Sequence, residues 1–255
     1  MSSSCPTRGV RSRLPTTLAG TPALRPGRPV ECEVTMSRHI FAGRTYRDRV
    51  HAGRLIAERL EDYRGHDLVV VALPRGGVPV AAVVAEYLDA PLDIVLVRKV
   101  GVPGQPELAA GAVTGDGAVV RNDDVIAGTG MTDADLASAT ERELVEVRRR
   151  TEAYRGERGA VPVDGKTVIV VDDGIATGAT MHAAVRALRS LGAGTVVVAA
   201  AVGPPDVESR FAEDADAVVC PSTPASFQAV GAAYDEFDQL TDERVRDLLG
   251  RSDRT

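Results

Sequence analysis

The chain has no tryptophan, few other aromatic residues and no long hydrophobic run among its 255 residues. Its only cysteines, Cys5, Cys32 and Cys220, are too few and too scattered for a disulfide framework or a zinc site. The four histidines also lack the spacing of metal ligands. No apolar stretch approaches the length of a membrane-spanning helix. These absences exclude a secreted disulfide scaffold and a zinc protein, and they make a reducing cytoplasm the simplest location.

The remaining composition is that of an enzyme domain. The hydrophobic content of 44% is enough for a real core, and the length allows one or two domains. The formal net charge of −6 argues against nucleic acid as the main partner.

Residues 1–35 differ from the rest, because they are rich in proline and arginine and contain no acid before Glu31. We expect a disordered, dispensable tail over 1–35 and one domain over 36–255. Two other interpretations stay open: an organelle transit peptide, and an upstream artefact preceding a start at Met36. A secretory signal is excluded by the missing apolar region.

From residue 41 onward, helical and strand patterns alternate. We expect helices at 49–63, 78–88, 132–154, 179–191, 206–212 and 242–249, and strands at 67–73, 93–97, 168–171, 195–202 and 217–220. A hairpin is expected over 110–120, where Gly115-Asp116-Gly117 supplies the turn. Short apolar strands separated by helices indicate an α/β fold, a parallel sheet flanked by helices on both faces.

The most informative segment runs from 168 to 180. Four apolar residues form a strand, Asp172 and Asp173 stand at its carboxyl end, and a small-residue loop leads into a helix. Gly174 and Gly178 allow the backbone to approach a ligand closely, and a helix amino terminus favours an anion. Paired carboxylates accept hydrogen bonds from hydroxyls, so the segment suits a sugar phosphate.

Two further loops follow strand ends, where parallel sheets bind ligands. The first is Pro74-Arg75-Gly76-Gly77, in which Arg75 is a cation able to grip phosphate. The second spans 98–111 and begins with Arg98 and Lys99; its prolines and glycines predict a mobile segment able to close over a substrate.

The 168–180 segment resembles the phosphoribosyl-pyrophosphate (PRPP) signature of the type I phosphoribosyltransferases. The resemblance implies that fold, with a small hood, and it implies that Asp172 and Asp173 hold the ribose hydroxyls. It further implies that the 5-phosphate is bound by the loop residues Gly174, Ile175, Ala176, Thr177, Gly178, Ala179 and Thr180. Arg75, Gly76 and Gly77 match the family's pyrophosphate loop, where a cis peptide around Arg75 and Gly76 is expected.

The 98–111 segment occupies the place of the loop that covers the reaction centre in related enzymes. Arg98 and Lys99 are therefore candidates to offset the pyrophosphate charge, or else they are cations at a strand end with their charges in water. Glu107 is a candidate general base or helper, or else a solvated acid.

The layout over 41–250, including Arg47-Asp48-Arg49 and Arg98-Lys99-Val100-Gly101, resembles a poorly assigned bacterial group of phosphoribosyltransferases. Ala176 replaces an aspartate usual in hypoxanthine–guanine enzymes, which disfavours a 6-oxopurine acceptor. Aromatic faces near the carboxyl end are expected either to stack on an acceptor base or to pack the last helix. These candidate hood residues are Phe227, Tyr234 and Phe237.

The resemblance implies a magnesium-dependent transferase, with Mg²⁺ held by ligand oxygens and water, and a homodimer. It implies that PRPP reacts with a nitrogen acceptor, a nucleobase or related small molecule, with release of pyrophosphate. Two alternatives are a PRPP-sensing regulator without catalysis and a chain whose acceptor pocket comes from a partner. A P-loop NTPase is disfavoured, because Gly165-Lys166-Thr167 precedes a strand and lacks the first glycine.

Overall fold

The computed structural model describes residues 46–156 and 158–252. The tail expected over 1–35 lies outside these residues.

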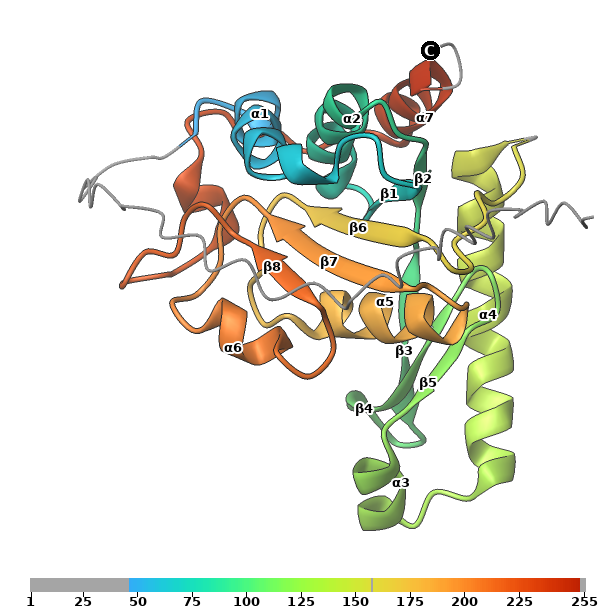
Figure 1. Cartoon of the computed structure of the whole chain (residues 1–255). Coiled ribbons are helices and arrows are strands. Elements are labelled where there is room, and N and C mark those ends of the chain that lie inside the picture. The colour runs from blue at the N-terminus through green and yellow to red at the C-terminus, as the bar shows by residue number, and fades with distance from the viewer. Residues whose placement is uncertain (1–45, 157, 253–255) are drawn as a thin grey trace, which may run out of the picture. The chain divides into compact units, whose positions relative to one another are not determined.

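A five-stranded, all-parallel sheet in the order β2-β1-β6-β7-β8 forms the centre of the domain (Figure 1). Its strands are β1 (Leu68–Ala72), β2 (Leu92–Ile94), β6 (Thr167–Asp172), β7 (Thr195–Ala200) and β8 (Ala217–Val219). Their nearly continuous apolar runs are typical of strands that are covered on both faces. The expected parallel sheet is confirmed.

Helices cover both faces of this sheet. One face carries α1 (Arg49–Arg59), α2 (Gly77–Leu88) and α7 (Asp242–Ser252), and the other carries α5 (Ala179–Ser190) and α6 (Val207–Phe211) (Figure 1). Because side chains alternate along a strand, Val70 and Ile169 pack under the first set of helices, and the neighbouring Val69 and Val168 pack against the second. The helix expected over 49–63 ends at Arg59 and is followed by a 3₁₀ turn over Glu61–Tyr63.

A smaller lobe is inserted between β2 and β6. It consists of an antiparallel sheet of β3 (Val97–Val102), β4 (Gln105–Thr114) and β5 (Val119–Arg121), with α3 (Asp123–Thr129) and α4 (Asp133–Arg155). Its own core includes Val100, Val113, Leu136 and Val147. The helix α4 begins with the expected capping box, in which Thr132 and Asp135 bond each other's backbone.

The loop conformation expected over 98–111 is wrong, because this segment forms the β3–β4 hairpin; its closing over a substrate stays a prediction. Val100 and Ala110 lie in the lobe core, and a turn at Pro103-Gly104 joins the strands, with Gly104 at a φ of 79°. The burial of its apolar residues against α4 stabilises the hairpin, and this outweighs the tendency of its glycines and prolines to form a loop. The hairpin expected over 110–120 is confirmed, since β4 and β5 pair around Ala112 and Val120.

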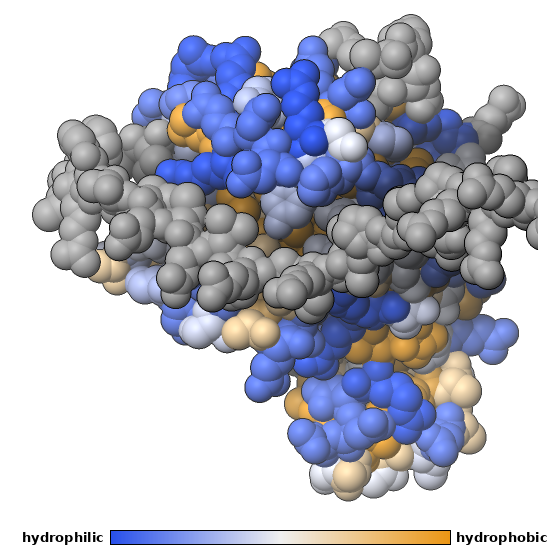
Figure 2. Space-filling model, viewed as in Figure 1, coloured by the Kyte–Doolittle hydropathy of each residue, from blue (hydrophilic) through white to orange (hydrophobic). Residues whose placement is uncertain are grey.

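Hydrophilic residues cover most of the visible surface around α1, whereas apolar residues reach the surface on the lobe (Figure 2). Among the large apolar residues that the structure shows as exposed, Leu108, Val119 and Val145 all belong to the lobe. No helix in the described part of the chain is both long and apolar enough to cross a membrane.

Candidate functional site

The loops after β1 and β6 meet because their strands are neighbours in the sheet. The register pairs Ala72 with Val171, and the Leu73 N–H donates to the Val171 carbonyl at 2.9 Å. A Cβ on Gly77 would lie 2.4 Å from the Val171 carbonyl oxygen, and one on Gly76 would lie 2.2 Å from Asp173 Oδ2. Only glycine permits this approach, so the glycine pair brings the 74–77 loop against the acids.

The two carboxylates are packed closely at the end of β6. The Asp173 N–H donates to Asp172 Oδ1 at 2.8 Å, and Asp173 is 8% exposed. Burial, and then the charge of Asp173, raises the pKa of Asp172 well above its ordinary value. Burial also raises the pKa of Asp173, against the opposing effect of Arg49. Hydrogen-bond donors stabilise a buried pair of carboxylates, and ribose hydroxyls would supply such donors.

The loop over 174–180 is anchored at its start and exposed at its tip. Ile175 is buried and its N–H donates to the Val202 carbonyl at 2.8 Å, whereas Ala176, Thr177, Ala179 and Thr180 are exposed. Gly178 precedes α5 with a φ of 82° and supplies no side-chain cap. The first N–H groups of a helix have no partner within the helix, so this end of α5 can bind an anion.

Arg75 follows a cis peptide bond between Pro74 and Arg75, in the loop where the resemblance implied one. Its half-exposed guanidinium lies 3.6 Å from Asp242 Oδ1, in the first turn of α7. Tyr154 of α4 donates to the same oxygen at 2.6 Å. The side chain thus pairs with α7, and its contact with pyrophosphate stays a prediction.

Arg98 and Lys99 lie on β3, in the lobe. Arg98 binds Glu143 of α4 through Nε at 2.8 Å and Nη2 at 2.7 Å. Both cations line a cavity of about 740 Å³ that reaches Thr180. Glu107 lies on β4, and its side chain is outside what the structure describes. The roles of these three residues in catalysis stay predictions.

The three aromatic residues of the expected hood differ in exposure. Tyr234 is buried and packs against Tyr46, with the two tilted rings 5.3 Å apart between centroids, and its hydroxyl donates to the Asp173 carbonyl at 2.6 Å. Phe227 is half-buried against the core. Phe237 is 38% exposed, so it is the one of the three with a ring open to solvent. Stacking on an acceptor stays a prediction, and Tyr234 instead secures the acid-bearing loop.

Arg49 is a residue of this site to which the sequence assigned no role. Its Nε lies 2.8 Å from Asp173 Oδ2, and its guanidinium carbon lies 3.9 Å from the centroid of the Phe237 ring. The triplet Arg47-Asp48-Arg49 at the start of a helix marks a charged segment. It does not predict the contact, because Arg49 and Asp173 are 124 positions apart in the sequence.

Comparison with known proteins agrees with this geometry. Residues 48–236 match the family described as "Phosphoribosyl transferase domain". Two Mycobacterium tuberculosis proteins, "Putative phosphoribosyl transferase Rv0571c" from strain H37Rv and "Putative phosphoribosyl transferase MT0597" from strain CDC 1551, are each 50% identical over 207 residues. The match covers 81% of this chain and 47% of each relative, so the chain spans about half the length of these proteins. The crystal structure of TT1426 from Thermus thermophilus superposes with a TM-score of 0.72 at 44% identity, covering 80% of this chain and 97% of that one.

Proposed function

Since this chain belongs to the family of phosphoribosyl transferase domains, we propose that it moves the 5-phosphoribosyl group of PRPP to a nitrogen acceptor and releases pyrophosphate. One observation carries the proposal. An acidic pair, a glycine-rich approach loop and the amino terminus of α5, where Gly178 supplies no side-chain cap, lie at the ends of β1 and β6.

In the proposed reaction the nitrogen lone pair forms a bond to carbon-1 of the ribose, and the bond to pyrophosphate oxygen breaks with its electrons going to pyrophosphate. The proton on the acceptor nitrogen passes to a base, a role for which Glu107 is the candidate. Asp172 and Asp173 accept hydrogen bonds from the ribose hydroxyls, and their charge favours the positive carbon centre that develops. The 174–180 loop holds the 5-phosphate through backbone N–H groups. Gly76 and Gly77 admit the pyrophosphate close to the backbone, and Arg75 is the cation proposed to meet it.

A magnesium ion fits the donors of this site. Mg²⁺ is commonly held by one or two carboxylates together with substrate phosphates and water. The described residues offer the Asp172–Asp173 pair and no cluster of three ligating side chains, so we propose that PRPP oxygens and water supply most of the coordination. When bound, the ion would neutralise charge on the leaving pyrophosphate.

The acceptor is proposed to be a nucleobase or a related small molecule. A cytoplasmic homodimer is proposed on family resemblance.

The test is pyrophosphate release from PRPP with Mg²⁺, across a panel of purine, pyrimidine and pyridine bases and simple amines. Asp173→Asn should lower turnover by about two orders of magnitude or more with folding intact, because a charged contact to the sugar is lost. Asp62→Asn, which changes an exposed acid, is the matched control. Near-normal turnover in Asp173→Asn would remove the proposed role of the acids. Tight PRPP binding without release for any acceptor would favour a PRPP-sensing regulator.

A further inference from the structure

Arg49 makes three contacts, one with Asp173 and two with the adjacent residues Phe237 and Asp238. At the start of α1, its Nε lies 2.8 Å from Asp173 Oδ2, and its Nη1 donates to the Asp238 carbonyl at 3.0 Å. Its guanidinium carbon stands 3.9 Å from the Phe237 ring centroid, well within the range of a cation–π contact. The side chains of Arg49 and Asp173 are each 11% exposed, so water screens this ion pair only weakly.

The same carboxylate is held from the other direction by the 74–77 loop. Asp173 Oδ2 lies where a Cβ on Gly76 would be only 2.2 Å away, so the Gly76 backbone packs directly against it. The Tyr234 hydroxyl fixes the main chain of Asp173 through the hydrogen bond to its carbonyl. The main chain of Asp173 is held by Tyr234, and its Oδ2 lies between Arg49 and Gly76. These contacts hold the Asp173 carboxylate in one orientation.

The charge of Arg49 also matters for the pair of acids. Two adjacent, buried carboxylates repel one another, and the Arg49 cation, 2.8 Å from Asp173 Oδ2, offsets part of that repulsion. Losing the cation would therefore weaken the pair as an acceptor of hydroxyl hydrogen bonds, besides releasing the side chain of Asp173.

Phe237 gives Arg49 a second connection, toward the carboxyl-terminal segment. The Phe237 ring stacks with Tyr234 at 5.0 Å between centroids and is contacted by the Arg49 guanidinium. Both of these neighbours bond Asp173 directly, Arg49 at the carboxylate and Tyr234 at the carbonyl. An influence of Phe237 on Asp173 would therefore pass through Arg49 or through Tyr234.

We propose that Arg49 is a positioning residue for PRPP: it orients Asp173 for the ribose hydroxyls and couples Phe237, on the expected acceptor side, to the ribose side of the site. This inference rests on the proposed function and extends it by a residue and a coupling. Because the contact to Asp173 passes through a charge-assisted hydrogen bond, its loss should act on PRPP affinity.

The experiment measures the dissociation constant of PRPP with Mg²⁺ by isothermal titration calorimetry, with melting temperatures recorded in parallel. Arg49→Gln should weaken binding about tenfold to a hundredfold, the range of a lost charged hydrogen bond. Arg49→Lys keeps the positive charge but lacks the several donors of the planar guanidinium. The PRPP affinity of this variant should therefore fall between those of Arg49→Gln and the unaltered protein. Arg54→Gln, an exposed arginine of the same helix, should bind PRPP normally.

Phe237→Leu tests the coupling. It should weaken PRPP binding about two- to fivefold by removing the cation–π contact, and it should weaken binding less in the Arg49→Gln background, where only the route through Tyr234 remains. If Phe237→Leu weakens PRPP binding by the same factor in the unaltered protein and in the Arg49→Gln variant, the coupling is overturned.

The outcomes separate the two proposals. If the unaltered protein does not bind PRPP, the proposed function fails and this inference fails with it. If the unaltered protein binds PRPP and Arg49→Gln binds within twofold of it, only the role of Arg49 is overturned. If Arg49→Gln does not fold, Arg49→Lys decides, and affinity equal to that of the unaltered protein overturns the role.

Discussion

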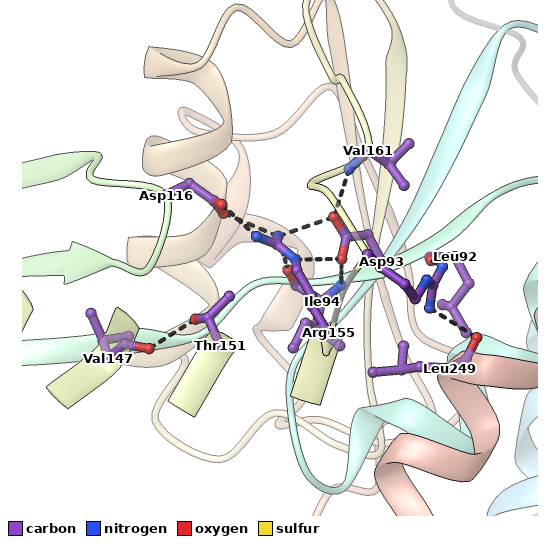
Figure 3. Close-up of polar contacts among 10 residues, drawn as sticks. Leu92, Asp93, Ile94, Asp116, Val147, Thr151, Arg155, Val161 and Leu249 are labelled. Atoms are coloured by element: carbon purple, nitrogen blue, oxygen red, sulfur yellow. Dashed lines mark hydrogen bonds and ion pairs between the residues drawn. The ribbon is translucent and has the colours of Figure 1, made fainter. Parts of the chain in front are cut away.

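Replacing Arg155 with methionine should destabilise the protein strongly, because Arg155 connects the lobe to the sheet (Figure 3). From the end of α4 it donates to Asp93 of β2 through Nε at 2.9 Å and Nη2 at 3.0 Å. It also donates to Asp116, in the turn between β4 and β5, through Nη1 at 2.6 Å, and to the Ile94 carbonyl at 3.0 Å. The side chains of Arg155 and Asp93 are 10% and 9% exposed, so the pair is nearly buried.

The loss of stability depends on which hydrogen-bond donors Asp93 would keep after Arg155 is removed. Removing one partner of a buried ion pair typically costs about 3–5 kcal/mol, because the other charge stays buried and unpaired. The Asp93 carboxylate would still accept from the backbone N–H groups of Ile94 and Val161, at 2.7 and 2.9 Å. These two donors offset part of the loss, so we expect about 3 kcal/mol, or a melting temperature roughly 6–12 °C lower for a domain of this size.

Urea denaturation followed by circular dichroism measures this change. Arg149→Met is the matched control, because Arg149 lies on the same helix, is exposed, and pairs with Glu146 one turn away; it should change stability by less than about 1 kcal/mol. Asp93→Asn removes the buried charge, so Arg155→Met should cost less in that background than in the unaltered protein. An Arg155→Met protein within about 1 kcal/mol of the unaltered one would refute this reasoning.

Three further predictions concern the proposed site. Asp172→Asn should raise the melting temperature little in acid and increasingly as the pH rises, because burial and the charge of Asp173 raise the pKa of Asp172 well above its ordinary value, so that stability from its protonated form is lost as the pH rises through that pKa; a difference that does not grow with pH, in melts at several pH values, would contradict this. Gly76→Ala should abolish PRPP binding in calorimetry, since the new Cβ would meet the Asp173 carboxylate, whereas Gly128→Ala, with open space around its Cβ position, should bind normally; retained binding in Gly76→Ala would count against the packing argument. Tyr234→Phe should lower stability by about 1–3 kcal/mol in urea melts, because the Asp173 carbonyl loses its buried hydroxyl donor; unchanged stability would mean that this hydrogen bond contributes nothing.

The β3–β4 hairpin shows where sequence reasoning needed tertiary contacts. Glycines and prolines in 98–111 are compatible with a loop, and nothing local reveals that Val100 and Ala110 are covered by α4. The helix α3 is not among the expected helices, although Asn122 at its start and Gly130 after its end are local signals of helix boundaries.

Local sequence patterns are enough to predict the parallel α/β architecture, the capping box of α4, and the acids, the 174–180 loop and the glycine pair at strand ends. Each of these depends on neighbouring residues, through hydrophobic period, capping chemistry or glycine spacing. Three ion pairs depend on the packing of distant elements: Arg49 with Asp173, Arg98 with Glu143, and Arg155 with Asp93 of β2. Those contacts join residues 124, 45 and 62 positions apart, and the partner of a charged side chain across such a separation is set by how the helices and sheets pack.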